Sequence, residues 1–219
     1  MWDETDSAGF IKLGAAFVPD RDLQLEIICD LLPDPKLAID LCCGEGLLSS
    51  AILRRFPGCR VIAYDGSGLM LERTRSRNIE GPLFDLADTG WREFAEKPDA
   101  VASSLAIHHL DGAGKRKLYA DMFRQIRPGG VLVVADLIEP ASEAAREIAA
   151  RQWDVAVGVE HREAFERERW NLYRYPDPET DKPSGLLDQL CWLREIGYVA
   201  VDVVYLRAGH AIFTGRIPF

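Results

Sequence analysis

The chain has 219 residues, of which 47% are hydrophobic, enough for one substantial core, so we expect a single domain over 1–219. Its formal net charge of -9 at pH 7 opposes the clustered positive charge that phosphate contacts need, so nucleic acid is not expected as a partner. No apolar run approaches the roughly 18 residues of a membrane span. The first six residues are acidic where a signal peptide would be basic. We therefore expect a cytoplasmic protein that does not contact a membrane.

The five cysteines form no recognisable framework. Their number is odd and no C-x-x-C pair occurs, so neither a set of disulfides nor a structural zinc site is indicated. We interpret them as reduced thiols. They are Cys29, Cys42, Cys43, Cys59 and Cys191.

Taken in chain order, the first part of the sequence alternates segments of helical spacing with short apolar runs. Pro19 precedes the first helix and Pro33 follows it, as expected at helix ends. Such strand and helix repeats predict an open parallel sheet with helices on both faces. The predicted elements are a helix over 20–32, a strand over 37–41, a helix over 47–56, a strand over 59–65, a helix capped by Ser67, strands over 82–86 and 100–106, a helix around 118–126 and a strand over 131–136.

Beyond Asp136 the pattern changes. Residues 139–183 are charged and aromatic, with helices predicted near 141–157 and 160–170 and a proline-rich stretch after them. The segment is too long for a simple connection, so we expect a lid or a substrate wall. Its aromatic residues either line an acceptor pocket or pack the segment onto the sheet.

The last elements predict a reversed strand. A helix capped by Ser184 and closed by Gly197 leads to strands over 198–206 and 211–215. The linker between these strands is too short for a crossover helix, so they must form an antiparallel hairpin. The predicted fold is α/β: a Rossmann-like, seven-stranded, mostly parallel sheet with an antiparallel terminal strand and helices on both faces.

The most informative motif lies at the end of the first strand. Residues 40–46 read DLCCGEG, and Asp65 ends the next strand. A glycine turn followed by an acid at the second strand's tip is typical of a site that binds the ribose of a nucleotide. The third glycine of a dinucleotide-binding turn is absent, because Leu47, Leu48 and Ser49 follow Gly46.

With the reversed terminal strand, this motif resembles the class I S-adenosylmethionine-dependent methyltransferases over roughly residues 20–136 and 184–216. The family pattern D-L-G-C-G-x-G is matched except at Cys42, where a glycine is replaced. The resemblance implies S-adenosylmethionine as the cofactor. It also implies that the segment 1–19 covers the cofactor site and that 139–183 forms a substrate lid.

The resemblance further implies which residues bind the cofactor. Asp65 would bind the ribose hydroxyls and Asp85 would face the adenine amino group. Asp40 would order the glycine turn that receives the amino acid end of the cofactor. Arg21 either reaches the carboxylate of that end or is a surface residue at the start of a helix. The full set of implied cofactor residues is Asp40, Gly44, Gly46, Asp65, Gly66, Ser67, Met70, Asp85, Leu86, Ser104 and Leu105.

His108 and His109 follow the fourth predicted strand and are the candidate general bases. An imidazole has a suitable pKa for proton transfer, but a packing or helix-start role is the alternative for both residues. A metal ion held by these histidines and Asp136 is not expected, because adjacent histidines seldom face one ion. The acids of the metal-dependent catechol methyltransferases are also missing at the corresponding places, which read Ser103-Ser104 and Asp136-Leu137.

The sequence therefore predicts methyl transfer to an oxygen, nitrogen or carbon nucleophile of a small metabolite. One alternative is a tRNA-modifying alkyl transferase with a cofactor of the same type, to which residues 183–193 bear some likeness. Another is a non-catalytic cofactor-binding protein. The oligomeric state is left open, with a homodimer as one possibility.

Overall fold

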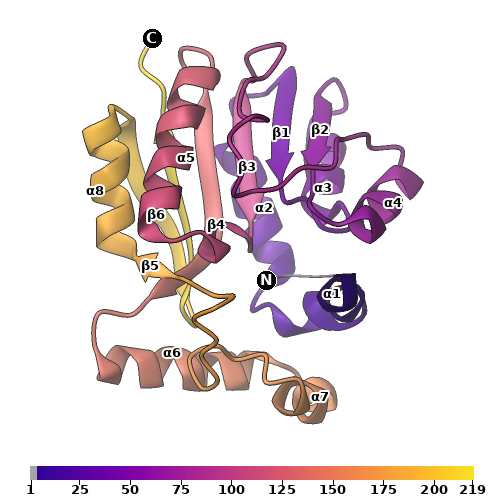
Figure 1. Cartoon of the computed structure of the whole chain (residues 1–219), viewed down its shortest axis with the longest axis vertical. Helices are drawn as coiled ribbons and strands as arrows, with labels where there is room; N and C mark the ends of the chain where they lie inside the picture. Colours follow the sequence, from indigo (N-terminus) through magenta and orange to yellow (C-terminus); the bar gives the residue numbers. More distant parts are fainter. Residues whose placement is uncertain (1–3) are drawn as a thin grey trace.

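The computed structural model describes residues 4–219; residues 1–3 of the expected covering segment lie outside the described residues. Within 4–219 the strands form one seven-stranded sheet of order β2-β1-β3-β4-β7-β6, with β5 pairing β4 off this path (Figure 1). Pairing is parallel from β2 to β4, and β7 runs antiparallel to both β4 and β6. The predicted fold class is confirmed. The strands are β1 (Leu37–Leu41), β2 (Arg60–Tyr64), β3 (Ala100–Ser104), β4 (Val131–Glu139), β5 (Ser184–Gly185), β6 (Val199–Arg207) and β7 (His210–Arg216).

Helices cover both faces of this sheet. On one face α2, α3 and α4 pack against the strands through Leu25, Ile52 and Leu71, and on the other α5 and α8 pack through Leu118 and Leu193. The helices are α1 (Glu4–Phe17), α2 (Arg21–Leu31), α3 (Leu47–Arg55), α4 (Gly68–Ser76), α5 (Gly112–Gln125), α6 (Glu143–Ala156), α7 (Arg162–Arg167) and α8 (Leu186–Ile196), with the short 3-10 helices η1 (Ile107–His109) and η2 (Val159–His161).

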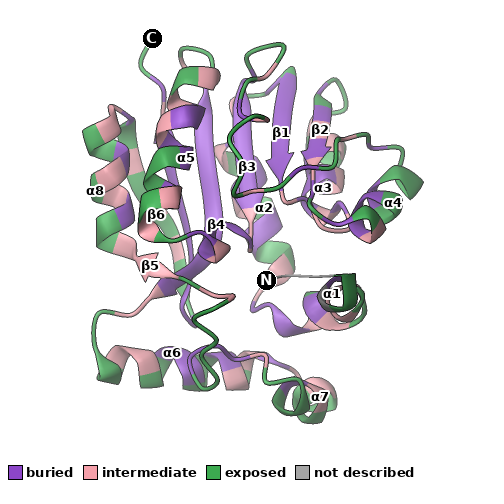
Figure 2. Ribbon diagram, viewed as in Figure 1, coloured by how far each residue is buried: buried purple, intermediate pink, exposed green. Residues whose placement is uncertain are grey.

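The central strands are buried on both sides. Every residue of β1 is buried, and β4 is buried from Val131 to Ile138, which Figure 2 shows as purple strands between partly exposed helices. Strands covered on both faces are continuous apolar runs rather than alternating ones. These segments can therefore be predicted as strands from the sequence. Each fully buried leucine or isoleucine contributes roughly 1.5–3 kcal/mol of transfer free energy.

A third apolar cluster lies beyond the carboxyl ends of the strands, where Figure 1 shows α1, α6 and α7 at the bottom of the view. Trp153 of α6 is 2% exposed and packs against Phe165 of α7. Its indole Nε1 donates a hydrogen bond of 2.8 Å to the carbonyl of Phe17, the last residue of α1. Two segments far apart in the sequence are thereby joined at one end of the sheet.

The strand predicted over 82–86 is wrong. Only one isolated parallel bridge forms there, Asp65 with Leu83, and a second joins Ile62 to Glu80 just before it. Pro82 has no N–H to donate, which interrupts the ladder. Gly81 lies so close to β2 that an added Cβ would stand 1.5 Å from the carbonyl oxygen of Ala63. The seventh strand is instead the two-residue β5, which was not expected.

The cap predicted for the last helix is also corrected. Gly185 occupies the N-cap of α8, and Ser184 belongs to β5, where its hydroxyl accepts a hydrogen bond from Lys115 Nζ. At the other end the prediction is confirmed, because Gly197 closes α8 with φ of 118°. Among the described residues, no helix is both long enough and apolar enough to cross a membrane.

Candidate functional site

A cavity of about 630 Å³ lies at the carboxyl ends of β1, β2 and β3. Ligands in open α/β sheets bind at this edge. The wall is completed by Glu4 and Phe10 of α1 and by Glu179, Thr180 and Lys182. A larger hollow of about 820 Å³ runs along the outer edge of β2, but it is lined by 60–62, Arg75 and 78–82 and contains none of the predicted site residues.

Most of the predicted site residues gather around the first cavity. Asp40, Gly46 and His108 are not part of its wall. Those that line it are Gly44, Asp65, Gly66, Ser67, Met70, Asp85, Leu86, Ser104, Leu105 and His109.

The turn after β1 leaves its backbone open to the cavity. Gly44 has φ of +55°, and a Cβ added there would meet no atom within 4 Å. Gly46 has φ of +81° and forms the N-cap of α3, away from the cavity. Cys42 also has a positive φ of 56°, in the left-handed region that favours glycine, which accounts for the glycine that the family pattern has at this place.

Asp65, just beyond β2, ties this turn to the next helix. One carboxylate oxygen accepts a hydrogen bond of 2.8 Å from the N–H of Gly44, and the other accepts one of 2.9 Å from the N–H of Ser67. Burial raises the pKa of Asp65, although these N–H groups oppose the shift. Ser67 caps α4 as predicted, since its hydroxyl accepts from the N–H of Met70.

Asp40 is buried inside β1 rather than exposed to the cavity. Ser49 Oγ donates a hydrogen bond of 2.6 Å to Asp40 Oδ2, which joins β1 to α3. Oδ1 has no hydrogen-bond partner among the described residues. Burial raises the pKa of Asp40 to about 6, against the opposing effect of Ser49. This carboxyl group therefore orders the turn from the side away from the cavity, by holding β1 and α3 together.

The two histidines have different surroundings. His108 is buried and its Nδ1 lies 2.5 Å from Asp136 Oδ1, while Asp136 Oδ2 accepts from the backbone N–H of His108. Burial alone would lower the pKa of His108, but the charge and hydrogen bond of Asp136 outweigh it and the pKa is raised. His109 lines the cavity, and its Nδ1 lies 3.1 Å from the carbonyl oxygen of Thr180.

Arg21, at the start of α2, also lines the cavity. Its Nη1 donates a hydrogen bond of 2.6 Å to Ser104 Oγ, and it makes no ion pair with the residues that the structure describes. Burial lowers the pKa of this guanidinium, with Asp40 opposing the shift. A cation so placed is suited to an anionic ligand group.

Sequence reasoning expected the segment 1–19 to cover the cofactor site, but it missed that residues 4–17 form a helix and that Glu4 contacts the start of α4. The carboxylate of Glu4 accepts hydrogen bonds from Ser67 Oγ at 2.6 Å and from the N–H of Gly68 at 2.9 Å. Glu4 thereby lies at the N-terminus of α4, where a negative charge is favoured. The acidic start of the segment was the signal for a helix N-terminus.

The fold and the site together define a class of protein. A mostly parallel sheet that ends in a reversed strand, with an open glycine turn after β1 and an acid at the end of β2, is the arrangement of the class I methyltransferases. A family model described as a methyltransferase domain matches residues 38–130.

Comparison with curated proteins agrees with this class. A trans-aconitate 2-methyltransferase of Methylobacterium radiotolerans is 36% identical over 131 residues, 58% of this chain and 49% of the relative. An uncharacterized methyltransferase of Mycobacterium tuberculosis is 30% identical over 151 residues, 66% of this chain and 72% of that protein. The chain spans about half the length of the trans-aconitate methyltransferases that it matches.

Solved structures share the fold. An O-methyltransferase family protein from Burkholderia thailandensis superposes with a TM-score of 0.68 at 15% identity, over 99% of this chain and 60% of its own. Streptomyces venezuelae DesVI superposes with a TM-score of 0.60 at 15% identity, over the whole of both chains. The chain belongs to the class I S-adenosylmethionine-dependent methyltransferases, as the sequence resemblance implied.

Proposed function

We propose that this chain binds S-adenosylmethionine in the cavity at the carboxyl ends of β1 to β3 and transfers its methyl group to an oxygen, nitrogen or carbon nucleophile of a small metabolite. The observation that carries the proposal is the position of the Asp65 carboxylate beside the open backbone of Gly44, in a cavity of about 630 Å³. That volume is within the usual range for small-molecule sites.

The chemistry of the donor set fits the cofactor. Each oxygen of Asp65 accepts one backbone N–H and keeps a lone pair for a ribose hydroxyl. The turn at Gly44 has room for the amino acid end, and Arg21 offers a guanidinium to its carboxylate. Met70, Asp85 and the backbone of Leu86 would line the adenine. The bound cofactor supplies a methyl group already activated by its sulfonium charge.

The residues of the chain then have to position the acceptor and exclude water. Well-oriented groups reach effective molarities of roughly 10⁵ M or more, so positioning alone supplies much of the acceleration. A carboxylate acceptor needs no base, whereas a hydroxyl acceptor benefits from one by roughly 10²- to 10⁴-fold. Of the two candidate bases, His109 lines the cavity. His108 does not line it and is paired with Asp136.

Calorimetry of S-adenosylmethionine and its demethylated product tests the cofactor part of this proposal. Asp65→Asn removes the charge while keeping the shape, so we expect about 10- to 100-fold weaker binding, as for the loss of one or two hydrogen bonds to a charged group. Asp88→Asn is the matched control, since Asp88 is exposed and does not line the cavity. Absence of binding by the unmodified chain would contradict the proposal.

The acceptor is tested by incubating the chain with metabolite pools and a methyl donor carrying an isotope label, with mass spectrometry as the readout. A labelled small molecule supports the proposal. A label found only in tRNA, with a salt-dependent RNA shift, would favour the alkyl transferase alternative. Cofactor binding without any labelled product would favour a non-catalytic binding protein.

A further inference from the structure

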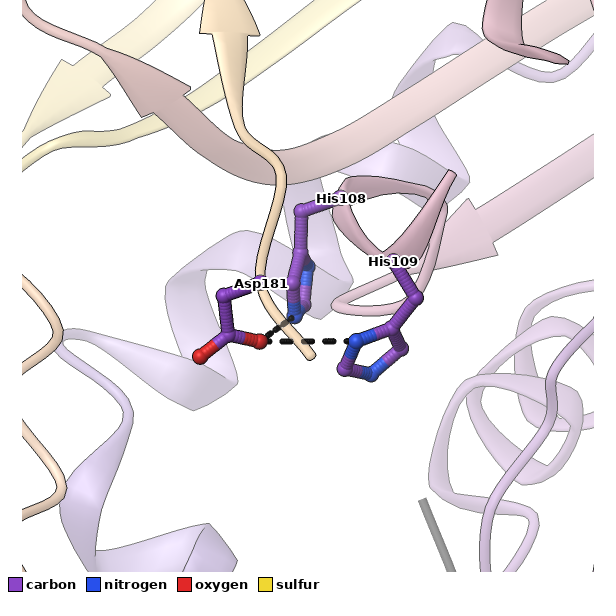
Figure 3. A group of neighbouring side chains, drawn as sticks. All are labelled: His108, His109 and Asp181. Carbon is purple, nitrogen blue, oxygen red and sulfur yellow. Dashed lines mark ion pairs between the residues drawn. The ribbon is translucent and has the colours of Figure 1, made fainter. Parts of the chain in front are cut away.

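Three side chains converge at the wall of the cavity, where the segment after α7 crosses η1. His108 Nε2 and His109 Nδ1 lie 3.5 Å and 3.4 Å from the same oxygen, Asp181 Oδ1. Figure 3 shows both rings turned toward that oxygen. The three ligand atoms all lie within 4.8 Å of one another.

The backbone holds this cluster in place. The two rings of η1 have centroids 4.2 Å apart and are inclined by 51°, so that neighbouring residues face one carboxylate. Asp181 is fixed on both sides, because its own N–H donates to the Asp177 carbonyl and the N–H of Lys182 donates to the His108 carbonyl at 2.8 Å. His108 is buried, while the side chains of His109 and Asp181 are each 24% exposed.

Asp136 determines how His108 meets Asp181. Asp136 Oδ1 lies 2.5 Å from Nδ1 of His108, so the neutral ring carries its proton there and directs a lone pair from Nε2 at Asp181. When the ring is neutral, Nε2 and Asp181 Oδ1 are two acceptors 3.5 Å apart, and either a proton on Nε2 or a metal ion supplies the positive charge between them. A histidine that binds a metal ion through one nitrogen commonly donates the other N–H to a carboxylate in this way.

We propose that His108 Nε2, His109 Nδ1 and Asp181 Oδ1 form a binding site for a divalent transition-metal ion such as Zn²⁺. Ligand atoms at about 2.0–2.1 Å from a tetrahedral ion are roughly 3.3–3.4 Å apart, close to the separations of Asp181 from the two histidines. Two imidazoles and one carboxylate favour zinc over magnesium or calcium, which prefer oxygen alone.

Three protein ligands leave one tetrahedral position open. His109 and Thr180 line the cavity, so the open position faces the space available to an acceptor oxygen. The sequence argument against a metal considered Asp136 as the third ligand. In the folded chain Asp136 contacts Nδ1 of His108, the nitrogen that points away from the cluster. Asp181, far along the sequence, faces Nε2 and is the third ligand.

Ion binding competes with a proton on His109. The carbonyl oxygen of Thr180 lies 3.1 Å from His109 Nδ1 and accepts a proton carried there, which a metal ion must displace. Binding is therefore expected to release protons and to weaken as the pH falls. If His109 is a general base, it keeps that function when a chelator removes metal ions, whereas a function of the bound ion is lost.

The experiment measures Zn²⁺ and Co²⁺ binding by calorimetry and absorption, without S-adenosylmethionine. The background is Cys191→Ser, which removes the exposed thiol. We expect one ion per chain and a cobalt d–d spectrum without a sulfur charge-transfer band. Asp181→Asn and His109→Gln should weaken binding by at least roughly 10- to 100-fold. The controls Asp88→Asn, at an exposed residue, and His161→Gln, whose side chain is 42% exposed, lie outside the cluster and should bind as the background does.

The proposal is overturned if the background chain binds neither ion, or if Asp181→Asn and His109→Gln bind as tightly as it does. It is also overturned if nuclear magnetic resonance shows His108 doubly protonated and unchanged by added Zn²⁺. Thermal unfolding of each variant verifies that it is folded. Because cofactor and acceptor are absent from this measurement, its failure leaves the proposed methyl transfer untouched.

Discussion

Asp40 and Asp65 lie on either side of the same glycine turn and have opposite surroundings. Asp65 accepts two backbone N–H groups and lines the cavity, so its charge is available to a ligand. Asp40 is 1% exposed, has one donor in Ser49, and leaves Oδ1 without a partner among the described residues. A buried carboxylate with one unmatched oxygen costs free energy when ionised.

This cost predicts a pH dependence of stability. Burial raises the pKa of Asp40 to about 6, above the value of about 3.9 in an unfolded chain. Between these values the folded state binds more protons, so the contribution of Asp40 to stability is lost as the pH rises through about 6. Asn cannot ionise, so Asp40→Asn should gain about 1–2 kcal/mol relative to the unmodified chain between about pH 5 and pH 8.

Urea unfolding of both chains at the two pH values measures this difference, and Asp34→Asn, an exposed position before β1, is the control. A difference between Asp40→Asn and the unmodified chain that does not change with pH would mean that Asp40 ionises normally in the folded protein.

Among the elements, α6 contacts the cavity indirectly, through its hydrogen bond to the end of α1. Trp153 packs between Phe165, Tyr173 and His210, and its Nε1 holds the end of α1 through Phe17. Since α1 supplies Glu4 and Phe10 to the cavity wall, one indole connects the segment after β4 to the site.

Two substitutions separate packing from hydrogen bonding at Trp153. Trp153→Ala should lower the free energy of unfolding by about 3–5 kcal/mol through the cavity it leaves. Trp153→Phe keeps a ring but leaves the Phe17 carbonyl without this donor, so we expect a loss of about 1–3 kcal/mol. Val155→Ala, on the exposed side of α6, should change stability by less than about 0.5 kcal/mol. Equal stability of Trp153→Phe and the unmodified chain in chemical denaturation would show that the hydrogen bond contributes nothing.

The sequence predicts those elements whose signals are local. The Ser67 cap, the Gly197 stop and the buried run of β4 each depend on residues within one turn or strand. The strand over 82–86 fails partly because Pro82 lacks an N–H and partly because Gly81 lies close against β2, and no local pattern records the second cause. His108 and His109 are adjacent in the sequence, so their proximity is predictable. The position of Asp181 beside them depends on the path of a long segment and is not.

At the scale of the whole molecule, β7 determines the order of the sheet. It lies between β4 and β6 and runs antiparallel to both, with Phe213 fully buried next to Tyr119. The core on the α5 and α8 face therefore includes residues from both the middle and the end of the sequence.

Phe213→Ala should destabilise the whole domain by about 3–5 kcal/mol. For a domain of this size the melting temperature should fall by roughly 10 °C in a single transition. The control Leu206→Ala changes a residue of β6 that is 59% exposed and should melt within about 2 °C of the unmodified chain. Two separate transitions in calorimetry would show that the hairpin of β6 and β7 unfolds independently of the parallel strands.

The place of β7 in the sheet has a consequence for synthesis. While the ribosome is still translating residues 140–209, β4 has a neighbour in β3 on one side and an open edge of unpaired N–H and C=O groups on the other. Apolar strands with open edges are sites of aggregation, and this edge closes only when residues 210–216 have emerged. A nascent chain that stalls within the segment between β4 and β7 therefore exposes one edge of an apolar strand.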